Sequence, residues 1–344
     1  MLSLIEQFNG KLKEVFLYIT YRCNLKCPYC YLGDRKRKID MSINTAGPLL
    51  KKLLALGARK ITFLGGEPTL HPFLPQFINT AKAVGFDYLR LDTNGQFNPT
   101  FLENPNLKFL NDISFSLDGV DPLTHGVLRS VRNYYFVINN IKRAIELGYT
   151  IRVTMTINSL NLSQVEEMVQ KMENMGVSVL NLHLVSNNGR AKDNKWLFLE
   201  EEKWIGFTQK ILPRLTKYNI KVKIPKRYIK EDELNLYDRT TCEVAKLSRL
   251  LITPDLKIYA CPLLLDSEKY FACFQNGEFI YSKNYRDNVF SENIGKGPVC
   301  PLLMKENYKK YRRKKILPLC VSYKRTNKDN QTSYLKDKLA RVCK

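Results

Sequence analysis

The sequence predicts an α/β fold whose sheet is mostly parallel. Short β-branched or apolar runs alternate with longer amphipathic runs through the first 185 residues, which is typical of strands joined by crossover helices. Polar motifs follow the strand-like runs directly, at the position where parallel sheets bind ligands. A length of 344 residues allows one barrel-sized domain and an appendage.

Six strands and four helices are expected to alternate in this region. The strands cover residues 15–20, 61–64, 88–91, 113–117, 151–157 and 179–184, and the helices cover 45–56, 74–84, 134–147 and 164–175. Crossover connections between successive strands imply parallel pairing. A further helix over 196–215 and a short strand from Lys221 follow. Periodicity alone leaves open whether the sheet curves into a barrel or is an open doubly wound sheet.

Three cysteines stand together after the first strand. The run from Tyr21 to Tyr31 reads Y-R-C-N-L-K-C-P-Y-C-Y, which spaces Cys23, Cys27 and Cys30 as C-x3-C-x2-C. Three thiolates hold three corners of a four-iron cluster and leave the fourth iron free to bind a small molecule. The alternative is a structural zinc ion, but zinc favours four protein ligands, and no fourth Cys or His lies within forty residues.

Composition narrows the cellular setting. The N-terminus lacks a basic stretch followed by an apolar core, and nowhere do eighteen apolar residues run together, so neither a signal peptide nor a transmembrane helix is expected. Nine cysteines, an odd number, indicate metal ligation in a reducing cytosol and not a disulfide framework. The three histidines are far apart, so sulfur is the expected iron ligand. We therefore expect a cytoplasmic protein.

The cysteine array resembles the hallmark of the radical S-adenosylmethionine (radical SAM) superfamily, in which an aromatic residue, here Tyr29, precedes the third cysteine. The resemblance implies a partial (βα)6, TIM-like barrel. It also implies a [4Fe-4S] cluster that binds S-adenosylmethionine (SAM) and cleaves it reductively to a 5′-deoxyadenosyl radical, which abstracts a substrate hydrogen atom. An electron donor such as flavodoxin or ferredoxin is an expected partner.

Motifs at the later strand ends resemble the SAM-binding motifs of the family. L-G-G-E-P-T, from Leu64 to Thr69, resembles the G-G-E motif that binds the SAM amino group. Its glycines allow close backbone approach, and its carboxylate suits an ammonium group. Arg129 resembles the arginine that pairs with the SAM carboxylate, with Arg132 as the alternative. The predicted cofactor-binding residues are Tyr29, Gly65, Gly66, Glu67, Asn94, Ser116, Asp118, Arg129, Thr156, Asn158 and Leu184. Turn or helix capping explains the Asn, Ser and Asp of this set equally well.

Cysteines return in the second half of the chain. The run from Cys242 to Cys261 resembles the opening of the SPASM and twitch extensions, which hold auxiliary iron–sulfur clusters, although Leu256 stands where that pattern has glycine. Thiolates on the two sides of a hairpin converge although eighteen residues separate them. We expect one auxiliary [4Fe-4S] cluster, with Cys242, Cys261, Cys300 and Cys320 as ligands. Cys273 is left over, either as a buried apolar thiol or as a hydrogen-atom donor.

The C-terminal stretch is strongly basic. Pro301 to Lys344 contains fourteen Lys and Arg against three Asp and Glu, an excess of +11 in a chain of net charge +22. Such a run is usually solvated, but it also attracts acidic partners: a peptide leader, a nucleotide-linked sugar, RNA or an anionic membrane surface. Interleaved tyrosines would suit stacking on bases, so nucleic acid stays among the candidate partners.

These observations predict four regions and an activity. Residues 1–193 are expected to form the radical SAM partial barrel, 194–240 a linking helix and strand region, 241–322 a SPASM/twitch-like auxiliary cluster domain, and 323–344 a basic tail. The expected activity is oxidation, cross-linking or epimerisation of a residue in an acidic peptide or a protein. A twitch-type dehydrogenase or epimerase of an aminosugar or other small molecule is one alternative. A basic RNA-binding or RNA-modifying protein with metal-stabilised loops is another.

Overall fold

One curved sheet organises the computed structural model, which describes residues 7–34, 39–236, 242–265, 267–282, 299–321 and 323–327. Twelve strands pair in the order β12-β11-β10-β9-β1-β2-β3-β4-β5-β6-β7-β14. They are β1 (Glu14–Thr20), β2 (Lys60–Gly65), β3 (Tyr88–Thr93), β4 (Asp112–Ser116), β5 (Ile151–Ile157), β6 (Val179–Leu184), β7 (Lys221–Pro225), β9 (Arg249–Ile252), β10 (Lys257–Tyr259), β11 (Ala272–Gln275), β12 (Glu278–Tyr281) and β14 (Lys324–Thr326).

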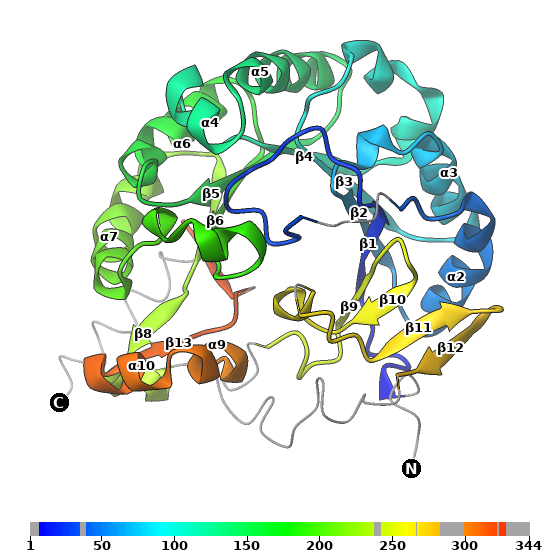
Figure 1. Cartoon of the computed structure of the whole chain (residues 1–344). Coiled ribbons are helices and arrows are strands. Elements are labelled where there is room, and N and C mark those ends of the chain that lie inside the picture. Colours follow the sequence, from blue (N-terminus) through cyan, green and yellow to red (C-terminus); the bar gives the residue numbers. More distant parts are fainter. Residues whose placement is uncertain are drawn as a thin grey trace.

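Helices cover the outside of this sheet. They are α2 (Ile43–Ala55), α3 (Leu74–Val84), α4 (Pro122–Leu128), α5 (Val131–Glu146), α6 (Val165–Asn174) and α7 (Glu201–Arg214). Figure 1 shows them as an outer arc around the strands, with the segment that follows β1 crossing the opening of the ring. Local signals set the helix ends: Ser42 caps α2, Asp121 caps α4, and Gly85 ends α3 at φ +113°.

The pairing confirms the predicted fold class. β1 to β7 pair in sequence order and all in parallel, and β9 pairs in parallel with the other side of β1. Within the described residues no pairing joins β12 to β14, so the sheet is an open, partial barrel. All six predicted strands are present. The short strand expected from Lys221 is β7, which joins the sheet as a seventh parallel strand.

The hydrophobic core lies between the sheet and the helices. Successive strand residues point to opposite faces, and Val15, Leu17 and Ile19 of β1 are fully buried against the helix layer. Each such side chain contributes roughly 1.5–3 kcal/mol by leaving water. A slip of one residue would expose all of them, so the core fixes which residues point into the ring.

The segments after α7 attach to both edges of the barrel. On the β1 side, β9 and β10 form the hairpin predicted between Cys242 and Cys261, and β11 and β12 continue the sheet. On the other side, β14 pairs with β7. A small second sheet joins β8 (Tyr228–Lys230) to β13 (Ile316–Pro318), beside α9 (Pro301–Glu306) and α10 (Tyr308–Lys314). Leu256 takes the glycine position of the hairpin at φ +60°, which strains an L-residue by roughly 1–2 kcal/mol.

Part of the basic C-terminal stretch is ordered. Lys324 and Arg325 belong to β14, and Tyr311 is only 4% exposed, so this tyrosine is not available to stack on a base. Residues 328–344, with Cys343 and most of the predicted tail, lie outside the described residues. Among the helices that the structure describes, none has both the length and the apolar character needed to cross a bilayer.

Candidate active site

The first cysteine loop lies at the carboxyl ends of the parallel strands and is fixed from two sides. The backbone N–H of Glu67 donates to the carbonyl of Arg22 at 2.7 Å. From the far side, Arg190 Nε donates to the carbonyl of Cys27 at 2.9 Å, and the Arg190 N–H donates to the carbonyl of Cys30 at 3.0 Å. Arg190 was not among the predicted site residues, and it lies six residues beyond the end of the strand predicted over 179–184.

The three thiols of this loop suit a cluster better than a single ion. Burial raises the pKa of Cys23 to about 12 and also raises the pKa of Cys27, so burial opposes the ionisation of both thiols and a bound metal would favour it. A zinc ion with Zn–S bonds of ~2.3 Å brings its sulfurs to within ~3.8 Å of one another. Among the described residues, no three thiols have their sulfur atoms all within 4.8 Å of one another. At least two of the three sulfur atoms are therefore farther apart than the ligands of one zinc ion, so the loop does not match a closed zinc site.

Glu67 is buried and hydrogen-bonded within the protein. Its Oε1 accepts from Thr93 Oγ1 at 2.6 Å and from Thr69 Oγ1 at 2.7 Å, and its Oε2 accepts from the Asn94 N–H at 2.7 Å. Burial raises the pKa of Glu67 against these hydrogen bonds. The carboxylate therefore ties the end of β2 to the end of β3. Its predicted role toward the SAM amino group stays a prediction.

Two predicted cofactor residues pair with each other. Arg129 Nε lies 2.5 Å from Asp118 Oδ2, with 9% and 0% of the two side chains exposed. The Tyr29 hydroxyl also donates to Asp118, whose Oδ1 accepts from the Thr156 N–H at 2.7 Å. Burial would lower the pKa of Arg129, but the Asp118 carboxylate holds it well above its usual value. The set joins the cysteine loop to β4 and β5. Its proposed contacts with SAM stay predictions.

The remaining predicted cofactor residues lie around this set. Asn94 Nδ2 donates to Asn24 Oδ1 at 2.7 Å and lies 4.0 Å from Cys23 Sγ. Ser116 ends β4 and Leu184 ends β6, both half-buried. Asn158 is fully buried, and its Nδ2 donates to the carbonyl of Thr156, which is a turn contact. Gly65 and Gly66 pack against the backbone of residues 20–22. Arg132, the alternative to Arg129, lies over Phe136 on α5.

The four later cysteines predicted as cluster ligands line a single pocket: Cys242, Cys261, Cys300 and Cys320. Cys242 hydrogen-bonds Cys320, and burial raises the pKa of both Cys261 and Cys300. The hairpin and the β13 region therefore bring together thiols that lie up to 78 residues apart in sequence. Cys273 is not part of this pocket. It lies on β11, where its Sγ contacts the carbonyl of Ile280 at 3.7 Å.

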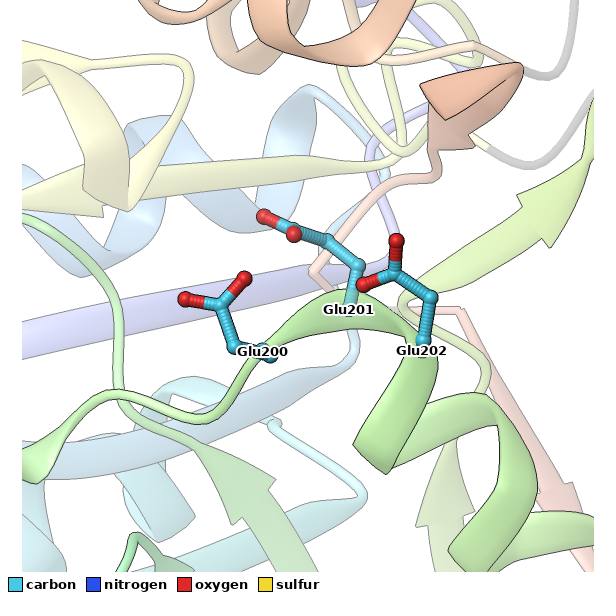
Figure 2. A group of neighbouring side chains, drawn as sticks. All are labelled: Glu200, Glu201 and Glu202. Carbon is cyan, nitrogen blue, oxygen red and sulfur yellow. The ribbon is translucent and has the colours of Figure 1, made fainter. Parts of the chain in front are cut away.

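Three carboxylates at the start of α7 resemble a cation site but already have partners (Figure 2). Glu200, Glu201 and Glu202 bring their oxygens within 4.8 Å of one another. Lys314 Nζ donates to all three, and Lys310 pairs with Glu201 at 2.9 Å. The carboxylates therefore hold α10 against α7, and we assign them no ligand.

A group of cations on the inner face of the ring was not predicted from the sequence. Arg90, Arg152 and Lys223 alternate with strand residues that are buried against the helices, so their side chains point inward. Lys324 of β14 joins them, donating to Asn181 Oδ1 and, at 3.0 Å, to the carbonyl of Leu182. Basic residues at alternate positions of short strands were the available signal.

This inner-face group has more positive than negative charge. Arg90 pairs with Asp92 at 2.8 Å and Arg152 pairs with Asp112 at 3.4 Å. Among the described residues, neither Lys223 nor Lys324 has a carboxylate within ion-pair distance. Burial and neighbouring cations lower the pKa of Lys223 to about 8 and lower the pKa of Lys324 as well. The two lysines make this interior a favourable environment for an anion.

Comparisons with known proteins agree with this geometry. The model of the radical SAM superfamily matches residues 17–172. A crystal structure of SuiB from Streptococcus suis bound to its precursor peptide SuiA superposes with a TM-score of 0.62 over 84% of this chain and 67% of that chain, at 17% identity. The structure of anSMEcpe with bound AdoMet gives a TM-score of 0.59 over 80% of both chains, at 15% identity. At such identities these likenesses show the fold.

Curated relatives of this chain are named for an activity that differs from the predicted one. A probable GTP 3′,8-cyclase of Methanococcus maripaludis strain C7 is 27% identical over 222 residues, covering 62% of this chain and 74% of that protein. One from strain S2 is 31% identical over 147 residues, covering 42% of this chain and 50% of that protein. The GTP 3′,8-cyclase of Chlorobaculum tepidum is 34% identical over 122 residues, covering 35% and 37%.

These relatives correct the predicted activity. The expectation that the chain modifies a peptide or protein residue is wrong, because the matching curated proteins are named as cyclases of a nucleotide. The same finding overturns the aminosugar and RNA-binding alternatives and argues against the oxidoreductase or epimerase class, since these relatives are named as cyclases. The radical SAM chemistry itself agrees with the family match.

Proposed function

Because this chain belongs to the radical SAM superfamily, we propose that it abstracts a hydrogen atom from an anionic nucleotide of the class to which GTP belongs. When bound, the [4Fe-4S] cluster and SAM supply the 5′-deoxyadenosyl radical that such a step requires. Cys23, Cys27 and Cys30 would hold this cluster. The pocket of Cys242, Cys261, Cys300 and Cys320 would hold the auxiliary cluster.

The observation that carries the nucleotide proposal is the excess positive charge inside the barrel. Lys223 and Lys324 face the same interior as Arg90 and Arg152, and no carboxylate among the described residues neutralises the two lysines. Desolvated ammonium groups without counter-charges are costly, and a phosphate chain supplies both the charge and the acceptor oxygens that they lack. A neutral substrate would leave that cost in place.

The relatives support the same substrate class. Their printed names state that GTP is the substrate and that positions 3′ and 8 become joined. The matched part spans about half to three quarters of the Methanococcus relatives, so GTP itself is proposed here for this chain. A radical formed on the ribose beside a purine ring would suit such a ring closure.

The test is anaerobic turnover with purified, reconstituted protein, SAM, dithionite and either GTP, ATP, CTP or guanosine. We expect 5′-deoxyadenosine and a modified nucleotide, both detected by mass spectrometry, from at least one triphosphate and not from guanosine. In the double variant Lys223→Gln with Lys324→Gln, the KM for that triphosphate should rise about tenfold to a hundredfold, as loss of charged hydrogen bonds implies.

Lys210→Gln is the matched control, because Lys210 is an exposed lysine on α7 and its replacement changes the net charge in the same direction. Its KM should equal that of the wild type. Formation of 5′-deoxyadenosine that no nucleotide increases, or equal KM values in the double variant and the wild type, would contradict the proposal.

A further inference from the structure

A buried arginine beside the second cysteine pocket lacks the partners that such a group needs. Arg227 lies between β7 and β8 and is 4% exposed. Its Nε and Nη1 have no hydrogen-bond partner, and among the described residues it forms no ion pair. Burying an unpaired guanidinium is strongly unfavourable, so an acceptor that carries negative charge is expected beside it.

The backbone places Arg227 next to two of the predicted cluster ligands. The Leu319 N–H donates to the carbonyl of Arg227 at 2.8 Å, one residue before Cys320. The Cys300 N–H donates to the carbonyl of Pro318 at 2.8 Å. Three adjacent segments thus carry the guanidinium and two thiols. The guanidinium is close enough to oppose, by its charge, the rise that burial gives to the pKa of Cys300.

A second arginine near this pocket makes a useful contrast. Arg249 lines the pocket and acts on Cys261 in the same direction, but Glu14 already neutralises it through Nε at 3.0 Å and Nη2 at 2.7 Å. Arg227 has no such carboxylate. Of these two cations, Arg227 is therefore the one whose charge no carboxylate among the described residues neutralises, so it can interact with a negatively charged group bound by the four thiols.

We propose that Arg227 is a positioning residue for the auxiliary cluster and that its buried positive charge beside Cys300 favours uptake of an electron. This inference rests on the auxiliary cluster of the proposed function. Four thiolates around a [4Fe-4S] core give a net negative unit, and reduction adds one more negative charge. Net charge and hydrogen bonds to sulfur set the potential of such clusters, so a nearby buried cation raises it.

The test is the reduction potential of the auxiliary cluster alone. A background in which Cys23, Cys27 and Cys30 are replaced by alanine removes the first cluster, and the second is reconstituted anaerobically and titrated while its electron paramagnetic resonance signal is followed. In Arg227→Gln and Arg227→Met we expect the reduction equilibrium to become at least tenfold less favourable, a downward shift of about 59 mV for one electron. Arg227→Lys keeps the charge, so its reduction potential should lie closer to that of the wild type than to that of Arg227→Gln.

Arg312→Gln is the matched control, because Arg312 is 56% exposed on α10 and pairs with Glu231 at 3.0 Å. It removes the same charge at the surface and should leave the potential unchanged. The proposal is overturned if the reduction equilibria of Arg227→Gln and Arg227→Met lie within twofold of the wild-type value. It is also overturned if their change equals that of Arg312→Gln. Loss of iron from all three Arg227 variants with retained secondary structure would overturn it in favour of a purely structural role. Absence of iron in the background protein itself would instead refute the auxiliary cluster.

Discussion

Replacing Gly66 with alanine is expected to destabilise the protein by about 2–6 kcal/mol and to empty the first cluster site. A Cβ at this position would lie 2.3 Å from the carbonyl oxygen of Arg22 and 2.7 Å from that of Tyr21. Ordinary contact begins at 3.4 Å, so the two backbone segments must separate by about 1 Å. The segment that would move carries Cys23.

The magnitude follows from what this separation breaks. The Gly66 N–H donates to the carbonyl of Thr20 and the Glu67 N–H to the carbonyl of Arg22, both at 2.7 Å. Two backbone hydrogen bonds contribute about 0.5–1.5 kcal/mol each, and overpacking at a rigid site costs about 1–3 kcal/mol more.

The assay combines urea unfolding of the metal-free protein with iron analysis after anaerobic reconstitution. Gly47→Ala is the control, since a Cβ there meets nothing within 4 Å and alanine favours the helix by about 0.5–1 kcal/mol. The reasoning is refuted if Gly66→Ala loses less than 1 kcal/mol and retains the iron content of the control.

Two further predictions concern charge. Asp118→Ala should destabilise the protein by roughly 3–5 kcal/mol because it leaves the Arg129 guanidinium buried and unpaired. Asp121→Ala, which removes the cap of α4 and the acceptor of a hydrogen bond from Gln164, should cost about 1–2 kcal/mol, and equal losses in urea unfolding would contradict this. The pKa of Lys223 is lowered to about 8, so its charge is present below pH 8 and lost above it. The KM for the active nucleotide should therefore rise between pH 7 and pH 9, and Lys223→Arg, which stays charged, should flatten that rise; parallel profiles would exclude Lys223 from binding. For the unliganded protein the sign is opposite: the unfolded chain binds the proton between about pH 8 and 10.5, so the contribution of Lys223 to stability improves as pH rises through that window.

Strands and the first cysteine loop could be predicted because their signals are local. The strands over 151–157 and 179–184 have the predicted bounds, since alternation with a period of two marks a strand that packs on one face. The spacing of Cys23, Cys27 and Cys30 is likewise contained in a single loop. Leu256 is the local exception: the hairpin forms with a leucine at φ +60°, because the pairing of β10 with both β9 and β11 outweighs the strain.

Pairing between distant residues could not be predicted from the sequence. Asp118 and Arg129 each lie in a sequence motif that suits ligand binding, and only the fold reveals that their side chains pair with each other. Lys324 belongs to a basic stretch that resembles a solvated tail, yet β14 brings it against β7 and into the ring. Glu67 looks like an exposed carboxylate of a turn, but the ends of β2 and β3 enclose it. In each case a long-range contact decides what the side chain can do.

Two iron–sulfur clusters are the central claim, and the iron and sulfide content of anaerobically purified, reconstituted protein tests it most directly. We predict about eight irons per chain in the wild type, and about four both when Cys23, Cys27 and Cys30 are replaced by alanine and when Cys242, Cys261, Cys300 and Cys320 are replaced instead. If the wild type contains four irons and the first variant contains none, the protein has no auxiliary cluster. A wild type that binds zinc and no iron would contradict the account as a whole.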